Sequence, residues 1–141
     1  MLVAATVAAG CGGGGHYPNQ PRPPSPVNMT VYINDQRVSV SPSSVGAGPV
    51  QLIVTNQASN SESLTVLAAG SAAGQPLADT GPISPQGTAQ VTVNLNSGNY
   101  TVATAPHAST EAANVAPGGI QAALVHVGKP RPSASNQLLQ P

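Results

Sequence analysis

Three histidines are the side chains of this sequence best suited to hold a metal ion, and they are His16, His107 and His126. Imidazole nitrogens together with carboxylate oxygens bind Cu(II) or Zn(II). His107 with His126, completed by Glu62 or Glu111, is one such combination. However, none of these residues stands at the short intervals typical of metal-ligand motifs. We therefore expect no metal site and keep His107 as the candidate to test.

Catalytic motifs are missing as well. Many serines are present together with Asp79, but no Gly-x-Ser-x-Gly segment contains any of them, and a Ser-rich chain yields triads by chance. The carboxylates are scattered singly rather than paired for acid–base work, at Asp35, Glu62, Asp79 and Glu111. The sequence therefore predicts a protein that is not an enzyme.

The composition restricts the partners further. The chain has 141 residues, only 6% of them charged, and its formal net charge is zero. Four basic residues balanced by four acidic ones predict no basic patch that could neutralise the phosphates of a nucleic acid, and the only aromatic residues for stacking on bases are three tyrosines. Nucleic-acid binding is therefore excluded, and the length fits one domain with flexible ends.

The N-terminus is typical of an export signal. Residues 2–9 are apolar or small, too short a run to span a bilayer, and they lead into Ala8-Ala9-Gly10-Cys11. This string resembles the lipobox of bacterial lipoproteins, although Ala8 stands where a leucine is usual. The resemblance implies a signal peptide over residues 1–10, cleavage between Gly10 and Cys11, and acylation of the Cys11 thiol.

A plain secretory signal with an incidental cysteine is the alternative. Cys11 is the only cysteine, so it cannot form an intramolecular disulfide, and acylation explains its presence in an exported protein. Two or three acyl chains would anchor the protein firmly to a membrane. No Lys or Arg precedes the apolar run, which suggests that translation starts upstream of Met1.

Two segments of biased composition flank the centre of the chain. Residues 11–26 are glycine-rich and then proline-rich, and form a tether with a reach of roughly 40 Å at about 3 Å per residue. Residues 129–141 return to Pro, Ser and Gln and are expected to be a disordered tail.

Between them, alternation of apolar and polar residues predicts short β-strands. These strands cover residues 27–34, 38–40, 50–55, 63–68, 88–95, 100–104 and 120–127, with a short edge strand around Ile83. Gly46 to Pro49 is expected to be a turn. In the last strand the inward series is Ile120, Ala122 and Leu124, which makes His126 a capped residue at the strand end.

About seven short strands without a helical period favour an all-β fold, an antiparallel Greek-key β-sandwich over residues 27–128. Its core would contain Val, Leu, Ile and Ala without Phe or Trp. The segment Asn96-Ser97-Gly98-Asn99-Tyr100 looks like a tyrosine corner, so Tyr100 is expected to be structural.

Several short motifs resemble small bacterial cupredoxin-like domains. They are the segment from Ser41 to Val50, the strand Leu52-Ile53-Val54-Thr55-Asn56, and Gly98-Asn99-Tyr100-Thr101-Val102. Thr104-Ala105-Pro106-His107 is similar to the Cys-Ala-Pro-His segment of plastocyanin-like proteins. The resemblance covers roughly residues 36–127 and implies a cupredoxin-like fold; an immunoglobulin-like sandwich is the other reading.

Blue-copper proteins of this family hold copper with two histidines, a thiolate and a weak axial methionine. On this sequence the first histidine falls at Glu62, the cysteine at Thr104, the second histidine at His107 and the methionine near Ile120. Only His107 keeps the residue type of the family. The resemblance therefore implies a cupredoxin-like scaffold that lacks the blue-copper ligands, and we expect no copper cofactor.

Together these features predict a non-catalytic protein, exported and held at the bacterial cell membrane or envelope by its N-terminal lipid. Its β-sandwich would act as a binding or structural module for an unknown envelope protein or ligand. The alternative is a metal-handling or electron-transfer cupredoxin with an atypical site centred on His107.

Overall fold

The computed structural model of the chain describes residues 24–69, 75–105 and 119–132, and these ranges contain eight β-strands and no helix. In chain order the strands are β1 (Val27–Ile33), β2 (Val38–Ser41), β3 (Ser44–Asn56), β4 (Glu62–Ala68), β5 (Ala78–Ile83), β6 (Thr88–Leu95), β7 (Gly98–Ala105) and β8 (Ala123–Pro130). No helix in these ranges is long and apolar enough to cross a bilayer. The predicted all-β class is confirmed.

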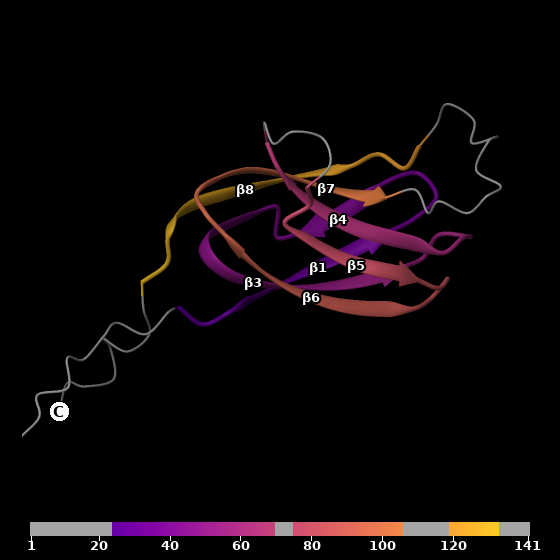
Figure 1. Cartoon of the computed structure of the whole chain (residues 1–141), viewed down its shortest axis with the longest axis horizontal. Helices are drawn as coiled ribbons and strands as arrows, with labels where there is room; N and C mark the ends of the chain where they lie inside the picture. Colours follow the sequence, from indigo (N-terminus) through magenta and orange to yellow (C-terminus); the bar gives the residue numbers. More distant parts are fainter. Residues whose placement is uncertain (1–23, 70–74, 106–118, 133–141) are drawn as a thin grey trace, which may run out of the picture.

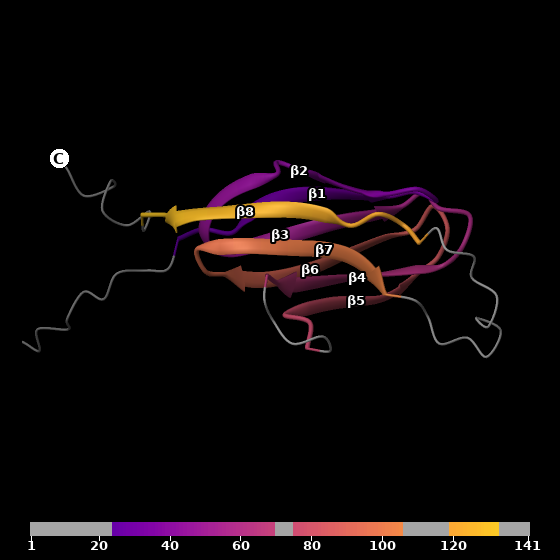
Figure 2. The same cartoon turned by 90° about the horizontal axis from the view of Figure 1, so that it is seen from above.

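The long strand β3 belongs to both layers of the sandwich. Residues 44–47 pair with β8, and from Gly48 onward β3 pairs with β6 and, from Val50, also with β1. One layer therefore has the order β2-β1-β3-β6, and the other runs β3-β8-β7-β4-β5. The ribbon of β3 curves round the left end of the molecule in Figure 1, and Figure 2 shows the strands from above.

The strand directions are mixed rather than wholly antiparallel. β1 is parallel to β3, and β3 is parallel to β8, whereas the other pairs are antiparallel. Alternation reports which face of a strand is buried but carries no information on the direction of its neighbours. For this reason the sequence could not distinguish a mixed sheet from an antiparallel one.

The core follows the predicted alternation in five strands. In β1 the side chains of Met29, Val31 and Ile33 are fully buried, and β3, β4, β6 and β7 bury alternate residues in the same way. The described core contains mainly Val, Leu and Ile, with Met29 and Tyr100 as its larger members. Each such side chain contributes roughly 1.5–3 kcal/mol when it is fully buried.

The predicted turn at residues 46–49 is wrong, because these residues lie inside β3. The register with β8 shifts between Gly46 and Ala47, so the strand contains an irregularity there. Gly48 has a φ of 134°, a conformation that favours glycine. This glycine lies where β3 passes from one layer to the other, so Gly and Pro at this point mark a bend in a strand and not its end.

The predicted inward series of the last strand is also wrong by one residue. Leu124 is 75% exposed, whereas Val125 and Val127 are buried. Both faces of this segment carry apolar residues, so alternation alone could not show which face is buried. The pairing decides it, because Val125 lies opposite Tyr100 of β7 and cross-strand partners share a face.

Both ends of the described domain lie at the same end of the sandwich, at the left of Figure 1. β1 begins there at Val27, and β8 leaves there after Pro130, two residues beyond the boundary of 128 expected from composition. Arg131 is still fixed to the domain, because its backbone N–H donates to the carbonyl of Ala47 at 3.0 Å. We call this the terminal end of the sandwich.

Candidate functional site

The opposite end of the sandwich, at the right of Figure 1, gathers three described connections: residues 34–37, 57–61 and 84–87. We call it the loop end. The last residues of β7 also reach it, because Ala105 pairs with Ser63 near the start of β4. Positions Glu62, Thr104 and Ile120, which the family resemblance matches to copper ligands, belong to this end of the fold.

Asn56 fixes the loop end from inside. It is the last residue of β3, is fully buried, and continues the inward series of that strand. Its side-chain amide donates to the carbonyls of Asn60 and Ile83, each at 2.8 Å, and its Oδ1 accepts the N–H of Ala58 at 2.9 Å. One amide group therefore ties the end of β3 to the following loop and to the end of β5.

Asp35 makes a second link at the same end. Its carboxylate accepts the backbone N–H of Ser59 at 2.7 Å and the hydroxyl of Ser59 at 2.8 Å. These bonds, with the backbone bond as the larger cause, lower the pKa of Asp35 below the usual range of an aspartate. The ionised carboxylate thus holds the β1–β2 connection against the β3–β4 connection.

Three of the four positions matched to copper ligands are described. Glu62 is the first residue of β4 and is half-buried. Thr104 belongs to β7 and pairs with Leu64 of β4, and Ile120 packs against the core. His107 falls outside the described residues, as do Cys11, His16 and Glu111. Within the described ranges, no three His, Cys, Asp or Glu side chains come together as a metal-binding group.

No protein-family model matches the chain, and no curated protein matches its sequence. Solved structures do match its fold. Reduced auracyanin from the photosynthetic bacterium Roseiflexus castenholzii is similar with a TM-score of 0.51 at 9% identity, over 74% of this chain and 98% of that chain. The fold of this chain is cupredoxin-like.

Two further cupredoxin structures are similar at lower scores. Auracyanin A of Chloroflexus aurantiacus, described as a "blue" copper protein, is 12% identical over 72% of this chain and 99% of its own, with a TM-score of 0.49. A blue copper oxidase from Nitrosomonas europaea is 15% identical over 71% and 43%, with a TM-score of 0.44. At these identities the likeness concerns the fold alone.

The donor set of the cupredoxin-like domain does not fit a blue-copper ion. Such a site depends on a thiolate, and the residue at the matched position is Thr104, whose hydroxyl is not a soft ligand. The only cysteine of the chain is Cys11, which precedes the domain in the sequence, and the domain begins at the terminal end, whereas Thr104 belongs to the loop end. No electron-transfer step through a blue-copper centre can be derived from these residues.

His126 does not lie at the loop end. It pairs with Asn99 at the second position of β7, and Ala105 lies six positions further along that strand, or about 20 Å of extended chain. The ring of His126 points away from the core and its Nδ1 is 2.9 Å from Oδ1 of Asn99. The predicted inward placement of His126 is therefore wrong, and the structure gives it a cross-strand partner on the outer face.

Tyr100 lies close to the terminal end of the cupredoxin-like domain. Its ring is buried, and its hydroxyl donates to the carbonyl of Asn96 at 2.8 Å. This bond closes the connection between β6 and β7 with the geometry of a tyrosine corner.

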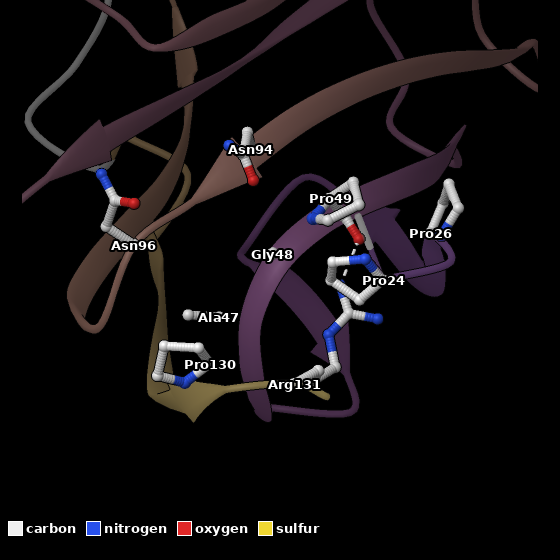
Figure 3. A pocket seen from close by; sticks show the side chains of 9 residues that line it. All are labelled: Pro24, Pro26, Ala47, Gly48, Pro49, Asn94, Asn96, Pro130 and Arg131. Carbon is white, nitrogen blue, oxygen red and sulfur yellow. Dashed lines mark hydrogen bonds between the residues drawn. The ribbon is translucent and has the colours of Figure 1, made fainter. Parts of the chain in front are cut away.

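The terminal end also contains a pocket of about 540 Å³. Figure 3 shows the side chains that surround it, from the start of the domain, the bend of β3, the end of β6 and the end of β8. They are Pro24, Pro26, Ala47, Gly48, Pro49, Asn94, Asn96, Pro130 and Arg131. Four prolines make it largely apolar, and the guanidinium of Arg131 is its one charged group.

Three backbone carbonyls hold that guanidinium in place. Nε donates to Gly46 at 3.1 Å, one terminal nitrogen donates to Ser25 at 2.8 Å, and the other donates to Pro49. Glycines in β3 make room for the side chain, because a Cβ at Gly46 would lie 2.6 Å from Cγ of Arg131. Composition had assigned Arg131 to a disordered tail, and no local sequence signal showed its contacts with residues more than 80 positions earlier.

Proposed function

We propose that this protein is an exported, lipid-anchored module of the bacterial cell envelope, attached through Cys11. Its cupredoxin-like domain would act as a binding or structural module without a blue-copper ion and without catalysis. The lipobox resemblance supports the lipid anchor, and the direction of the chain supports exposure of the loop end to partners in the envelope. Because the tether enters at the terminal end, the loop end would face away from the membrane.

The observation that carries the proposal is the residue at the thiolate position. The cupredoxin scaffold is present, and Asn56 and Asp35 fix its loop end by hydrogen bonds, yet Thr104 stands where the copper–sulfur bond would form. A scaffold whose described connections at the loop end are held by hydrogen bonds, but whose thiolate position holds a hydroxyl, suits binding of a partner through its surface better than electron transfer.

The placement of the carboxylates supports a role without catalysis. Asp35 binds Ser59 at the loop end, and Asp79 accepts the N–H of Gly81 at 2.6 Å within β5. Each therefore has a local partner, and neither is directed at a second carboxylate, as the paired groups of an acid–base site would be.

Metal titration tests the copper-free proposal. The full chain carrying Cys11→Ser, which removes the thiol, is titrated with Cu(II) and Zn(II) by calorimetry and followed by visible absorption. We expect no stoichiometric binding and no intense charge-transfer band. One equivalent bound tightly would contradict the proposal.

Intact-mass measurement tests the anchor. Wild-type protein recovered from host membranes should begin at Cys11 and carry the added mass of two or three acyl chains. Cys11→Ser should remove that mass and release the protein from the membrane fraction. A soluble wild type without added mass would favour the plain secretory signal instead.

A metal-handling site at the loop end is the second candidate, and one placement favours it. Ser63 pairs with Ala105, so Glu62 at the start of β4 is next to the strand that leads, two residues later, into His107. If metal does bind in the titration, His107→Ala should abolish it and His126→Ala should not.

A further inference from the structure

Charged side chains are rare in this chain and unevenly distributed along the sandwich. The described cations Lys129 and Arg131 lie at the terminal end, and Arg22 stands two residues before Pro24 in the sequence. The loop end carries Asp35 and Glu62 with a single cation, Arg37. The terminal end is therefore positive and the loop end is slightly negative.

The cations of the terminal end surround an apolar hollow. Lys129 is exposed next to Pro130, and Arg131 forms one wall of the proline-lined pocket (Figure 3). Three of the five N–H groups of the Arg131 guanidinium donate to backbone carbonyls, which leaves two without an acceptor among the described residues. Apolar surface next to fixed cations suits contact with a bilayer interface, where phosphate groups lie above glycerol and acyl chains.

The chain also connects this end to the expected anchor. Cys11 precedes Pro24 by 13 residues, so a lipid on Cys11 would keep the terminal end within roughly 40 Å of the bilayer. Tethering of this kind raises the effective concentration of the lipid surface at the domain. Because each Lys or Arg near an anionic surface strengthens binding about fivefold, two or three cations then suffice to orient a domain.

We propose that the terminal end of the sandwich docks on an anionic lipid surface, with Lys129 and Arg131 toward the phosphate groups. The opposite charge of the loop end favours the same orientation. The location of the lipid rests on the proposed anchor at Cys11, whereas the charge and shape of the docking surface do not depend on it.

The sequence itself supplies the probes for a test. Lys129 is the only lysine and Cys11 is the only cysteine. The full chain, produced without acylation, is coupled through Cys11 to a maleimide lipid in vesicles of phosphatidylcholine, either alone or with three parts in ten phosphatidylglycerol. Acylation of Lys129 by an uncharged N-hydroxysuccinimide ester is then followed by peptide mass spectrometry.

On the anionic vesicles we expect Lys129 to react at least about threefold more slowly than on the neutral ones, because the anionic lipid surface holds the terminal end and covers its amine. Half-molar salt should restore the rate, since it screens the attraction. Equal acylation rates on the two kinds of vesicle would overturn the proposal, whether or not both rates are lower than that of the uncoupled protein in solution.

A double variant places the same probe at the other end. Lys129→Arg with Arg37→Lys keeps the net charge and moves the only lysine to the loop end, where Arg37 is exposed. Its acylation rate should be the same on both vesicles, and a threefold loss there would show that no particular end docks. Coupling through maleimide bypasses acylation in the cell, so failure of the lipoprotein proposal shows in the intact mass and not in this experiment.

Discussion

Asn56 is a polar residue on the buried face of a strand, and its side chain joins three segments of the loop end. Replacement by alanine leaves the N–H of Ala58 buried without its partner, and the carbonyl of Ile83 keeps only the bond from the hydroxyl of Ser61 at 3.2 Å. We expect Asn56→Ala to lower the free energy of unfolding by about 2–4 kcal/mol, measured by urea denaturation at pH 7.

Asn60 provides the matched control for this prediction. Its backbone carbonyl accepts the bond from Asn56, but its side chain is exposed. Asn60→Ala should therefore change the free energy of unfolding by less than about 0.5 kcal/mol. If both variants unfolded at the same urea concentration as the wild type, the amide of Asn56 would not hold the loop end.

Asp35 makes the stability of the loop end depend on pH. Because hydrogen bonds from Ser59 lower its pKa in the folded state, the ionised form stabilises the fold above the pKa of an unfolded aspartate, about 3.9. This stabilisation is lost as the pH falls below about 4 through the folded-state pKa. Urea denaturation at pH 7 and pH 3 should show a smaller loss of stability on acidification for Asp35→Asn than for the wild type.

The carboxylate of Asp79, which is also exposed, allows a comparison. Asp79→Asn gives the same change of charge away from Ser59. An acid-induced loss that Asp79→Asn reduced as much as Asp35→Asn would contradict the assignment to the Asp35–Ser59 bonds.

Among the strands, β3 belongs to both layers of the sandwich. At its bend Gly48 has a φ of 134°, and a Cβ there would lie 2.9 Å from the guanidinium of Arg131 and 3.0 Å from the ring of Pro24. We expect Gly48→Ala to lower the free energy of unfolding by about 1–3 kcal/mol, through strain and contact together. Gly119→Ala, whose Cβ would meet none of the described residues within 4 Å, should stay near the wild type in the same urea titration.

The strands that the sequence predicted correctly are those with one apolar and one polar face, such as Met29, Val31 and Ile33 of β1. The bend of β3 escaped prediction because glycine and proline also mark turns, and only the pairing with β8 shows that the strand continues. The buried face of β8 escaped prediction because both its faces carry apolar residues, Leu124 on one and Val125 and Val127 on the other. For Asn56 a signal did exist, since it continues the inward series Val50, Leu52, Val54 with a polar side chain that had to find partners.

The candidate site was predictable only in part. The resemblance of Thr104-Ala105-Pro106-His107 to the Cys-Ala-Pro-His segment of plastocyanin-like proteins matched Thr104 to the thiolate position, and the likeness to auracyanin confirms the cupredoxin-like scaffold on which that match rests. Asp35 and Ser59 are 24 positions apart in the sequence, and Arg131 bonds to Gly46, which lies 85 positions earlier. Contacts of this kind depend on which strands lie side by side, which no local pattern specifies.

At the scale of the whole molecule, the end of β8 closes the domain against its own beginning. Arg131 bonds to Ser25 before β1 and to Gly46 and Pro49 in β3, so the two ends of the domain and the bend of β3 form one unit. A chain ending after Gly128 loses these bonds and the last residues of β8, whereas a chain ending after Pro132 keeps them. We expect the shorter chain to be less stable by about 2–4 kcal/mol.

Comparing the two truncated chains by urea denaturation isolates residues 129–132, because both lack the same nine residues that follow. Arg131→Ala in the longer chain should reproduce a large part of the loss, since the carbonyls of Gly46, Ser25 and Pro49 then lose a charged donor. The two truncated chains would have equal stability only if the domain ended at residue 128, as composition suggested. In that case the positive terminal end would be a loose segment and could not orient the sandwich on a membrane.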